Sequence, residues 1–224
     1  MALSRLDRLD RLPAAERGIT IGDFLVPITI GERIGTRVRH VALIVAGALF
    51  IYLGALIVIP VPGSPVPITG QTLGVLVVGS ALGFRRGILA TLTYVAIGVI
   101  GIPAFAEHRA GIAVIASVSD GRIVLGATGG YLLGFVLAGA IVGRLAELGW
   151  DRHLGGSILA MVLGSAAIYA VGLPWLAAAA SLSPAQAVAQ GLTPFVLGDL
   201  VKIALAGGAF PVAWWVVERR PGER

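Results

Sequence analysis

Pro194-Phe-Val-Leu-Gly-Asp-Leu-Val-Lys-Ile-Ala-Leu-Ala-Gly-Gly-Ala-Phe-Pro-Val-Ala-Trp-Trp-Val-Val217 is an apolar run long enough to cross a bilayer as a helix. It holds two charged side chains, Asp199 and Lys202, and Lys202 is the only lysine of the chain. A charge near the centre of a membrane helix costs about 2.5–3.5 kcal/mol on insertion scales. The i, i+3 spacing puts both side chains on one helix face, where they can touch. We therefore predict an ion pair inside the last span, about 7–12 Å from its N-terminal end.

The rest of the chain is equally apolar. Of 224 residues, 57% are hydrophobic and only 13% are charged, against about 25% charged in soluble domains. Five more apolar stretches precede the last one: Val41–Ile59, Ile68–Phe84, Gly87–Phe105, Ile123–Gly143 and Gly155–Ala180. The sequence thus predicts an all-α integral membrane protein with six transmembrane helices.

Two regions follow from this pattern. Residues 36–224 are predicted to form a six-helix membrane domain, and residues 1–35 a cytosolic N-terminal extension. In the extension, leucines recur every three residues with arginines between them, at Leu3, Leu6, Leu9 and Leu12. This pattern fits a basic helix on the membrane surface or a solvated tail, and the sequence does not decide between them.

Arginine placement predicts the orientation. With the N-terminus in the cytosol, 14 arginines fall in inner segments and only Arg109 and Arg122 fall in outer ones. Positive charge favours the cytosolic side, so both termini are predicted to be cytoplasmic. Arg109 stands out as a cation on the side that usually avoids cations. The net charge of +5 is spread among the connectors, so we expect no nucleic-acid partner.

Small residues and connectors suggest how the helices pack. Gly126, Gly130 and Gly134 repeat at four-residue spacing, which makes a flat face for another helix of the same bundle. Ala42 and Ala46 repeat that spacing in the first stretch, where either packing within the chain or a partner protein fits. The proline-rich connector Pro60–Pro67 is interpreted as a lid over a ligand or as a fixed turn.

Several kinds of chemistry are excluded. The three histidines lie in connectors, the chain has no cysteine, and it lacks an H-E-x-x-H motif. The single lysine follows Val201 rather than a glycine, so the chain has no Walker A loop. We therefore expect no enzyme activity, catalytic residue, metal or cofactor. Trp214 and Trp215 fit an aromatic belt at the inner membrane interface.

Three interpretations of the ion pair remain. Asp199 and Lys202 can bind a polar, hydrogen-bonding solute, as intramembrane charges often do. The chain can instead be a proton-coupled small-molecule carrier acting alone, with Asp199 as its protonation site. In the third interpretation the pair only fixes helix packing.

Several stretches, taken in order, resemble the BioY family, the biotin-binding S components of energy-coupling factor (ECF) vitamin transporters. The stretches that carry the resemblance are Pro65-Val-Pro-Ile-Thr69 with Gln71, Leu82-Gly83 with Arg86-Gly87, Tyr94 and Gly98 leading to Gly101-Ile-Pro-Ala-Phe-Ala106, Gly126-Ala-Thr-Gly-Gly-Tyr-Leu132 with Gly134-Phe135, Ile168-Tyr169 with Gly172, Trp175 and Leu176, and Pro194-Phe195 with Gly198-Asp199 and Lys202. They cover roughly residues 50–207. Ala127, Ala104 and Glu107-His-Arg-Ala110 depart from the usual family pattern.

The resemblance implies a multi-pass subunit in the bacterial cell (inner) membrane that captures biotin from outside. Its expected partners are a transmembrane coupling protein and ATP-hydrolysing subunits, which fits the missing Walker A loop. Ala42 and Ala46 are the candidate partner interface.

The resemblance also suggests a substrate-binding site. Biotin has a ureido group with two N–H donors and a carbonyl, and it ends in a carboxylate. Asp199 and Lys202 suit the ureido group, and Arg109 suits the carboxylate. Tyr169, Trp175 and Tyr131 are expected to wall the ring system, with Gln71 either at the site or satisfying loop backbone groups.

Overall fold

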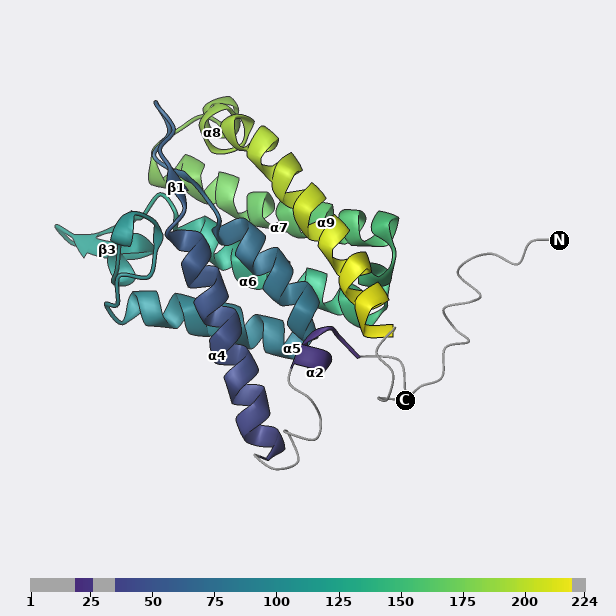
Figure 1. Ribbon diagram of the computed structural model, residues 1–224. Helices are drawn as coiled ribbons and strands as arrows, with labels where there is room; N and C mark the ends of the chain where they lie inside the picture. Colours follow the sequence, from purple (N-terminus) through teal and green to yellow (C-terminus); the bar gives the residue numbers. More distant parts are fainter. Residues whose placement is uncertain (1–18, 26–34, 219–224) are drawn as a thin grey trace.

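The computed structural model describes residues 19–25 and 35–218, which are mostly helical (Figure 1). The helices are α2 (Gly22–Leu25), α4 (Thr36–Ala55), α5 (Gln71–Val99), α6 (Gly129–Glu147), α7 (Leu154–Ala179), α8 (Pro184–Gly191) and α9 (Val196–Glu218). Short 3₁₀ turns are η2 (Ala106–His108), η3 (Ile112–Val114), η4 (Trp150–Arg152) and η5 (Thr193–Phe195). The strands are β1 (Val58–Ile59), β2 (Ile68–Thr69), β3 (Ala116–Ser119) and β4 (Arg122–Leu125).

Within the described residues, five helical segments are long and apolar enough to cross a membrane. These are α4, α5, α6, α7 and the run from Pro184 to Val217 that contains α8 and α9. On α9, Leu197, Leu200 and Leu205 point outward and are well exposed. Such an apolar outer face suits contact with lipid, whereas Asp199 on the same helix is buried within the bundle. An all-α membrane fold is therefore confirmed.

Helix α5 is two arms folded back on each other at Gly83. Gly83 has φ 80° and ψ −177°, a conformation that only glycine adopts readily. In a straight helix Gln71 and Tyr94 would lie about 34 Å apart, but the Gln71 side-chain amide donates a hydrogen bond to the Tyr94 hydroxyl. The two arms correspond to the predicted second and third apolar stretches. The count of six transmembrane helices stays a prediction.

Glycines let the arms meet each other and α6. A Cβ on Gly87 would lie 3.1 Å from the Cα of Gly79, and a Cβ on Gly79 would lie 3.0 Å from the carbonyl oxygen of Gly139. In the predicted glycine series, Gly130 packs against Trp175 and Gly134 against Ile168, both on α7. The prediction of helix packing is confirmed for these two glycines, whereas Gly126 lies before α6 and approaches the Val114 carbonyl of a connector.

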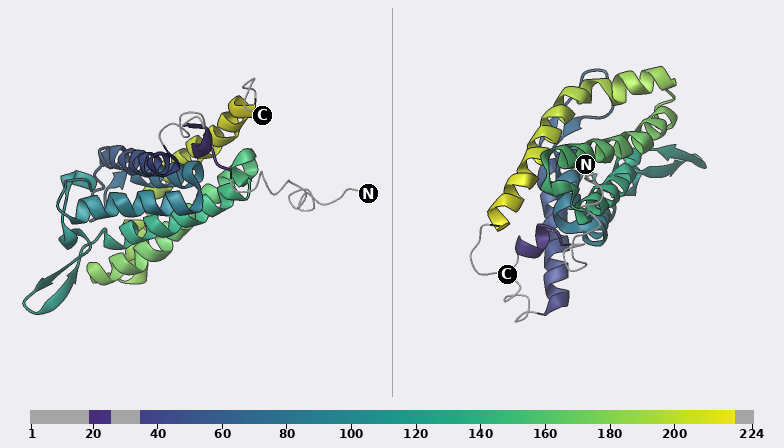
Figure 2. Two further views of the ribbon diagram at one scale, coloured as in Figure 1. Left: turned by 90° about the horizontal axis from the view of Figure 1, so that it is seen from below. Right: turned by 90° about the vertical axis from the view of Figure 1, so that its right-hand side faces the viewer.

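Several predicted boundaries were wrong. The fourth stretch was predicted to begin its helix at Ile123, but residues 122–125 form β4, which pairs antiparallel with β3, and α6 starts at Gly129. Apolar β-branched residues such as Ile123 and Val124 suit a strand as well as a membrane helix. Figures 1 and 2 show the β3–β4 hairpin projecting from the bundle.

The connectors also differ from expectation. The first stretch was predicted as a helix to Ile59, but α4 ends at Ala55 and Val58–Ile59 pairs with Ile68–Thr69. The proline-rich connector is thus the tip of a short hairpin. The predicted loop between Ser181 and Leu192 contains α8, which starts with a capping box between Ser183 and Gln186 and has a proline in its first turn.

Residues 19–25 pack against the helical body near the bend of α5. The Asp23 carboxylate accepts hydrogen bonds from Arg86 at 2.8 and 3.0 Å, and Arg39 of α4 donates to the Asp23 carbonyl oxygen at 2.6 Å. Burial alone would raise the pKa of Asp23, but these arginines and the backbone N–H of Thr20 lower it below its ordinary value. Leu3–Leu12 lies outside the described residues, and a separate extension to residue 35 stays a prediction.

Replacing Asp23 by Asn is expected to lower the free energy of unfolding by about 1–2 kcal/mol at pH 7, because Arg86 loses its charged acceptor. A lowered folded pKa stabilises the protein above the unfolded pKa of 3.8, and this contribution is lost as the pH falls through the folded value. Thermal unfolding in detergent at pH 7 and pH 3 should therefore show a smaller pH effect in the variant. Asp120→Asn, in the exposed β3–β4 turn, is the control; equal stability of wild type and Asp23→Asn at pH 7 would contradict the prediction.

The tryptophans of α9 divide between core and surface. Trp214 is buried, and its indole N–H donates to Asp151 at 2.7 Å, while the Arg152 guanidinium lies 4.7 Å from its ring centre. Burial raises the pKa of Asp151 to about 6, although the Trp214 bond and the Arg152 charge act in the opposite direction. The interpretation of Trp214 as a belt residue was therefore wrong, whereas Trp215 is exposed.

Candidate functional site

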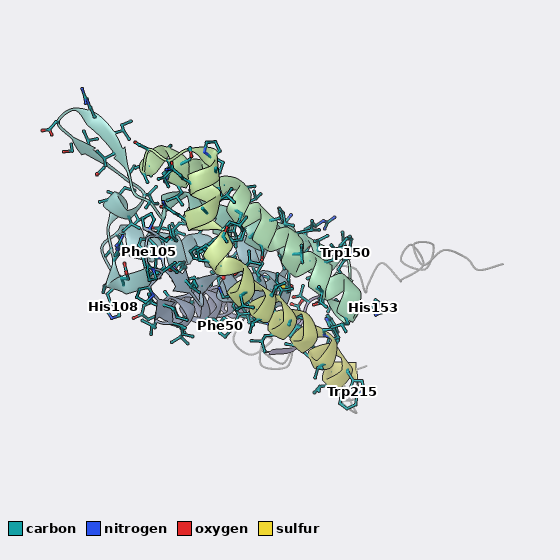
Figure 3. The ribbon with its side chains drawn as sticks, turned by 90° about the horizontal axis from the view of Figure 1, so that it is seen from above. Phe50, Phe105, His108, Trp150, His153 and Trp215 are labelled. Atoms are coloured by element: carbon teal, nitrogen blue, oxygen red, sulfur yellow. The ribbon has the colours of Figure 1, made fainter. Side chains whose placement is uncertain are left out.

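A cavity opens between α5, α6, α7, α9 and the connectors at one end of the bundle, and its empty volume of about 670 Å³ includes open solvent at its mouth. Figure 3 places Phe105 and His108 at this end and Trp215 and His153 at the opposite end. Six of the seven predicted substrate-binding residues line the cavity: Asp199, Lys202, Arg109, Tyr169, Tyr131 and Gln71.

The predicted contact between Asp199 and Lys202 is present. The Lys202 ammonium lies 3.2 Å from Asp199 Oδ1, and each side chain is only 12% exposed. Lys202 also donates to the Thr72 hydroxyl of α5 at 2.9 Å, and the Tyr169 hydroxyl of α7 donates to Asp199 Oδ2. Three helices thus hold the two charges in place.

This cluster keeps free hydrogen-bonding capacity. An ammonium has three N–H donors, and two of those of Lys202 are used; a carboxylate accepts about four hydrogen bonds, and Asp199 accepts two. A bound solute can therefore receive a hydrogen bond from Lys202 and donate hydrogen bonds to Asp199. Such bonds are charge-assisted and are strong in a site shielded from water.

A second polar group lies where α5 begins. Gln71 accepts a hydrogen bond from the Thr69 hydroxyl at 2.9 Å and donates one to the Tyr94 hydroxyl, which donates to the Ala104 carbonyl at 3.0 Å. Gln71 therefore bonds to side-chain hydroxyls rather than only to loop backbone. Tyr94 is fully buried and does not line the cavity, but it fixes Gln71 and the connector that begins at Ala104.

Apolar and aromatic side chains form most of the remaining wall. The rings of Tyr131 and Tyr169 meet edge to face with centroids 6.3 Å apart, and the Tyr131 hydroxyl donates to the Gly191 carbonyl at 3.0 Å. Sequence reasoning missed several wall residues: Thr72, Phe105, Glu107, Thr128, Leu132, Phe135, Ile168 and Phe195. Phe135 follows Tyr131 by four residues, so helical spacing could have identified it.

Trp175 was wrongly assigned to the cavity wall. Its indole N–H donates to the Gly126 carbonyl at 2.9 Å, and its side chain packs against Gly129 and Gly130. A Cβ on Gly130 would lie 2.2 Å from the Cβ of Trp175. Trp175 therefore joins α7 to the start of α6 and does not line the cavity.

Arg109 lies at the mouth of the cavity. Its guanidinium is 2.9 Å from a Glu107 carboxylate oxygen, and the two side chains are 52% and 40% exposed. The proline-rich hairpin also reaches the cavity, since Val66 and Pro67 line it. The interpretation of that hairpin as a lid or a fixed turn stays a prediction.

The candidate partner interface lies on α4. Ala42 and Ala46 are both exposed, and Figure 1 shows the N-terminal half of α4 extending beyond the neighbouring helices. The partner interface itself stays a prediction. Across residues 19–25 and 35–218, no three His, Asp or Glu side chains gather where they could hold a metal ion.

Comparison with known proteins adds independent information. Residues 26–219 match the model of the BioY family. The chain is 34% identical to the biotin transporter BioY of Rhizobium etli over 71% of this chain and 83% of the relative. It is 36% identical to the biotin transporter BioY of Thermotoga maritima over 74% and 85% of the two chains. For the biotin transporter BioY of Rhodobacter capsulatus the identity is 36%, over 82% and 95%.

A solved structure supports the fold. The crystal structure at 2.1 Å of the S-component for biotin from an ECF-type ABC transporter matches with a TM-score of 0.70 and 23% identity, covering 84% of this chain and 94% of that chain. Since the family model spans most of the sequence and the relatives exceed 30% identity over more than two thirds of it, this chain belongs to the BioY family.

Proposed function

We propose that this chain captures biotin from outside the cell and is the membrane-embedded substrate-binding subunit of an uptake transporter. The chain is a multi-pass membrane protein of a transporter family, not an enzyme family. The observation that carries the proposal is the Asp199–Lys202–Tyr169 cluster at the wall of a largely apolar cavity with a guanidinium at its mouth.

The proposed fit places the ureido group at the cluster. Asp199 accepts a ureido N–H, and the unused N–H of Lys202 donates to the ureido carbonyl. The apolar bicycle then lies against the aromatic wall that includes Tyr131 and Phe135. The charged end of biotin stays at the solvated mouth, where Arg109 binds its carboxylate.

The proposed partners are a transmembrane coupling protein and ATP-hydrolysing subunits. Support comes from the exposed α4 face with Ala42 and Ala46, and from the lack of a Walker A loop in this chain. Uptake by membrane vesicles should then require the partner subunits and ATP. Uptake driven by a pH gradient without any ATPase would instead favour the stand-alone proton-coupled carrier with Asp199 as its protonation site.

A direct test is whether labelled biotin stays bound to the detergent-solubilised, purified protein. We expect tight retention, with unlabelled biotin competing and other vitamins not competing. Tight binding of another vitamin together with weak biotin binding would overturn the substrate assignment.

The proposed orientation of biotin predicts that ligand affinity depends on the charge of the group at the mouth of the cavity. Biotin methyl ester should bind about tenfold more weakly than biotin, because it loses the charge-assisted bond to Arg109 at a half-exposed site. In Arg109→Ala, biotin should bind as weakly as the ester does. The measurement is the Kd of both ligands in both proteins.

Arg122→Ala is the matched control, because Arg122 lies in β4, is exposed and does not line the cavity. The ratio of ester to acid affinity should be unchanged in that variant. An equal preference for the acid in wild type and Arg109→Ala would contradict the orientation and place the carboxylate at Asp199 and Lys202.

A further inference from the structure

The mouth of the cavity contains a carboxylate of its own. Glu107 and Arg109 both line the cavity, and Glu107 Oε2 lies 2.9 Å from Arg109 Nη2. One nitrogen of the guanidinium that would bind a ligand carboxylate is therefore already paired with a protein carboxylate. Because both side chains are about half exposed, a ligand arriving from solvent can reach this pair.

The backbone holds the two side chains together at the mouth. Glu107 and His108 both have left-handed conformations, with φ of 59° and 58°, which is uncommon for residues other than glycine. The turn is closed by the Phe105 N–H donating to the Arg109 carbonyl at 3.1 Å and the Arg109 N–H donating to the Ala106 carbonyl at 3.2 Å. Tyr94 anchors its start through the Ala104 carbonyl. Figure 3 shows His108 of this turn at the edge of the molecule.

We propose that Glu107 is a specificity-determining residue that competes with the ligand carboxylate for Arg109. This inference rests on the proposed function, in which biotin presents its carboxylate at the mouth. Binding then exchanges one carboxylate for another at the guanidinium, and the loss of the Glu107–Arg109 pair offsets part of the gain from the new one. Glu107 thus weakens the binding of acids relative to neutral analogues, which leave the Glu107–Arg109 pair intact.

The test compares biotin with biotin methyl ester in four proteins: wild type, Glu107→Gln, Arg109→Ala and the double variant. Glutamine keeps the size of the side chain and removes its charge. Glu107→Gln should bind biotin about two- to tenfold more tightly than wild type, as expected for a partly solvated charge pair, and should bind the ester with unchanged Kd. In the Arg109→Ala background, the increase in biotin affinity caused by Glu107→Gln should be at most half as large, because the guanidinium for which the two carboxylates compete is absent.

Two matched controls separate competition from other effects. Asp120→Asn makes the same change of net charge in the β3–β4 turn outside the cavity, and it should leave both Kd values unchanged. His108→Gly relieves the neighbouring left-handed residue without changing the carboxylate, and it should leave the ratio of the two Kd values unchanged.

The possible failures are distinguishable. If Glu107→Gln leaves biotin binding unchanged, or changes acid and ester binding equally, Glu107 acts only in loop structure and the inference is overturned. If Glu107→Gln raises the affinity for biotin equally in the wild-type and Arg109→Ala backgrounds, Glu107 acts by long-range repulsion rather than by competition for Arg109. This result would also overturn the inference. Absence of biotin binding by the wild-type protein would overturn the proposed function itself.

Discussion

Asp199→Asn is expected to weaken biotin binding by about 100-fold or more, measured as the Kd of labelled biotin for the purified protein in detergent. Asparagine keeps the shape of the side chain but replaces a charged acceptor with a neutral amide. The variant loses the charge-assisted bond to the ureido N–H and leaves the mostly buried Lys202 ammonium without its counter-charge. Removing one partner of a buried charged pair commonly costs about 2–5 kcal/mol, which corresponds to about 30- to several-thousandfold in affinity.

Lys202→Ala tests the other half of the same cluster, and we expect a loss of similar size. It removes the donor to the ureido carbonyl and also the bond to the Thr72 hydroxyl. Tyr169 still donates to Asp199 in this variant, so the carboxylate keeps one partner. The folded fraction, measured by thermal unfolding, distinguishes loss of the site from loss of the fold.

Two further variants make the result interpretable. Asp151→Asn replaces another buried acid, which bonds Trp214 at the opposite end of the bundle, and should leave the Kd for biotin unchanged. Asp199→Leu with Lys202→Leu replaces the pair by apolar side chains, a change that is often neutral for stability. If this double variant retains full biotin binding and uptake, the pair has only a structural role.

The site was predictable from the sequence where its geometry is local. Asp199 and Lys202 touch because any helix brings residues i and i+3 together, so their contact could be predicted before the fold was known. Thr72 and Tyr169 contact the same charges from α5 and α7, across 130 and 30 residues of sequence. Those contacts depend on how three helices pack, which helical periodicity alone does not specify.

The errors have the same physical origin. Trp175 has the size and polarity of a ligand-binding residue, but its direction is set by the close approach of α7 to Gly129 and Gly130. Ile123–Leu125 is apolar enough for a membrane helix, yet it pairs with β3 because the preceding turn at Asp120 and Gly121 brings the two segments together. The bend of α5 was expected only as a break between the stretches that end at Phe84 and begin at Gly87, because residue types alone do not specify the backbone angles of Gly83.

Gly83→Ala is expected to lower the free energy of unfolding by about 2–4 kcal/mol. At φ 80° and ψ −177° an alanine is strained, at a cost of about 1–3 kcal/mol. Its Cβ would also lie 2.9 Å from Glu147 Oε1 and 3.1 Å from Thr20 Cγ2, so residues on α6 and before α2 must shift. Thermal or denaturant unfolding in detergent measures the change.

Gly83→Ala should also weaken biotin binding, because the bend at Gly83 brings the two arms of α5 together at the cavity. Gln71 and Thr72 lie on the first arm, and Tyr94, which holds Gln71, lies on the second. A shift between the arms therefore disturbs the Gln71–Tyr94 bond and the Thr72 contact with Lys202. Gly208→Ala is the matched control, since its Cβ would meet nothing within 4 Å and alanine favours a helix. If Gly83→Ala is as stable and binds biotin as tightly as Gly208→Ala, the bend does not require glycine, and the arms are held in place by packing against α6 alone.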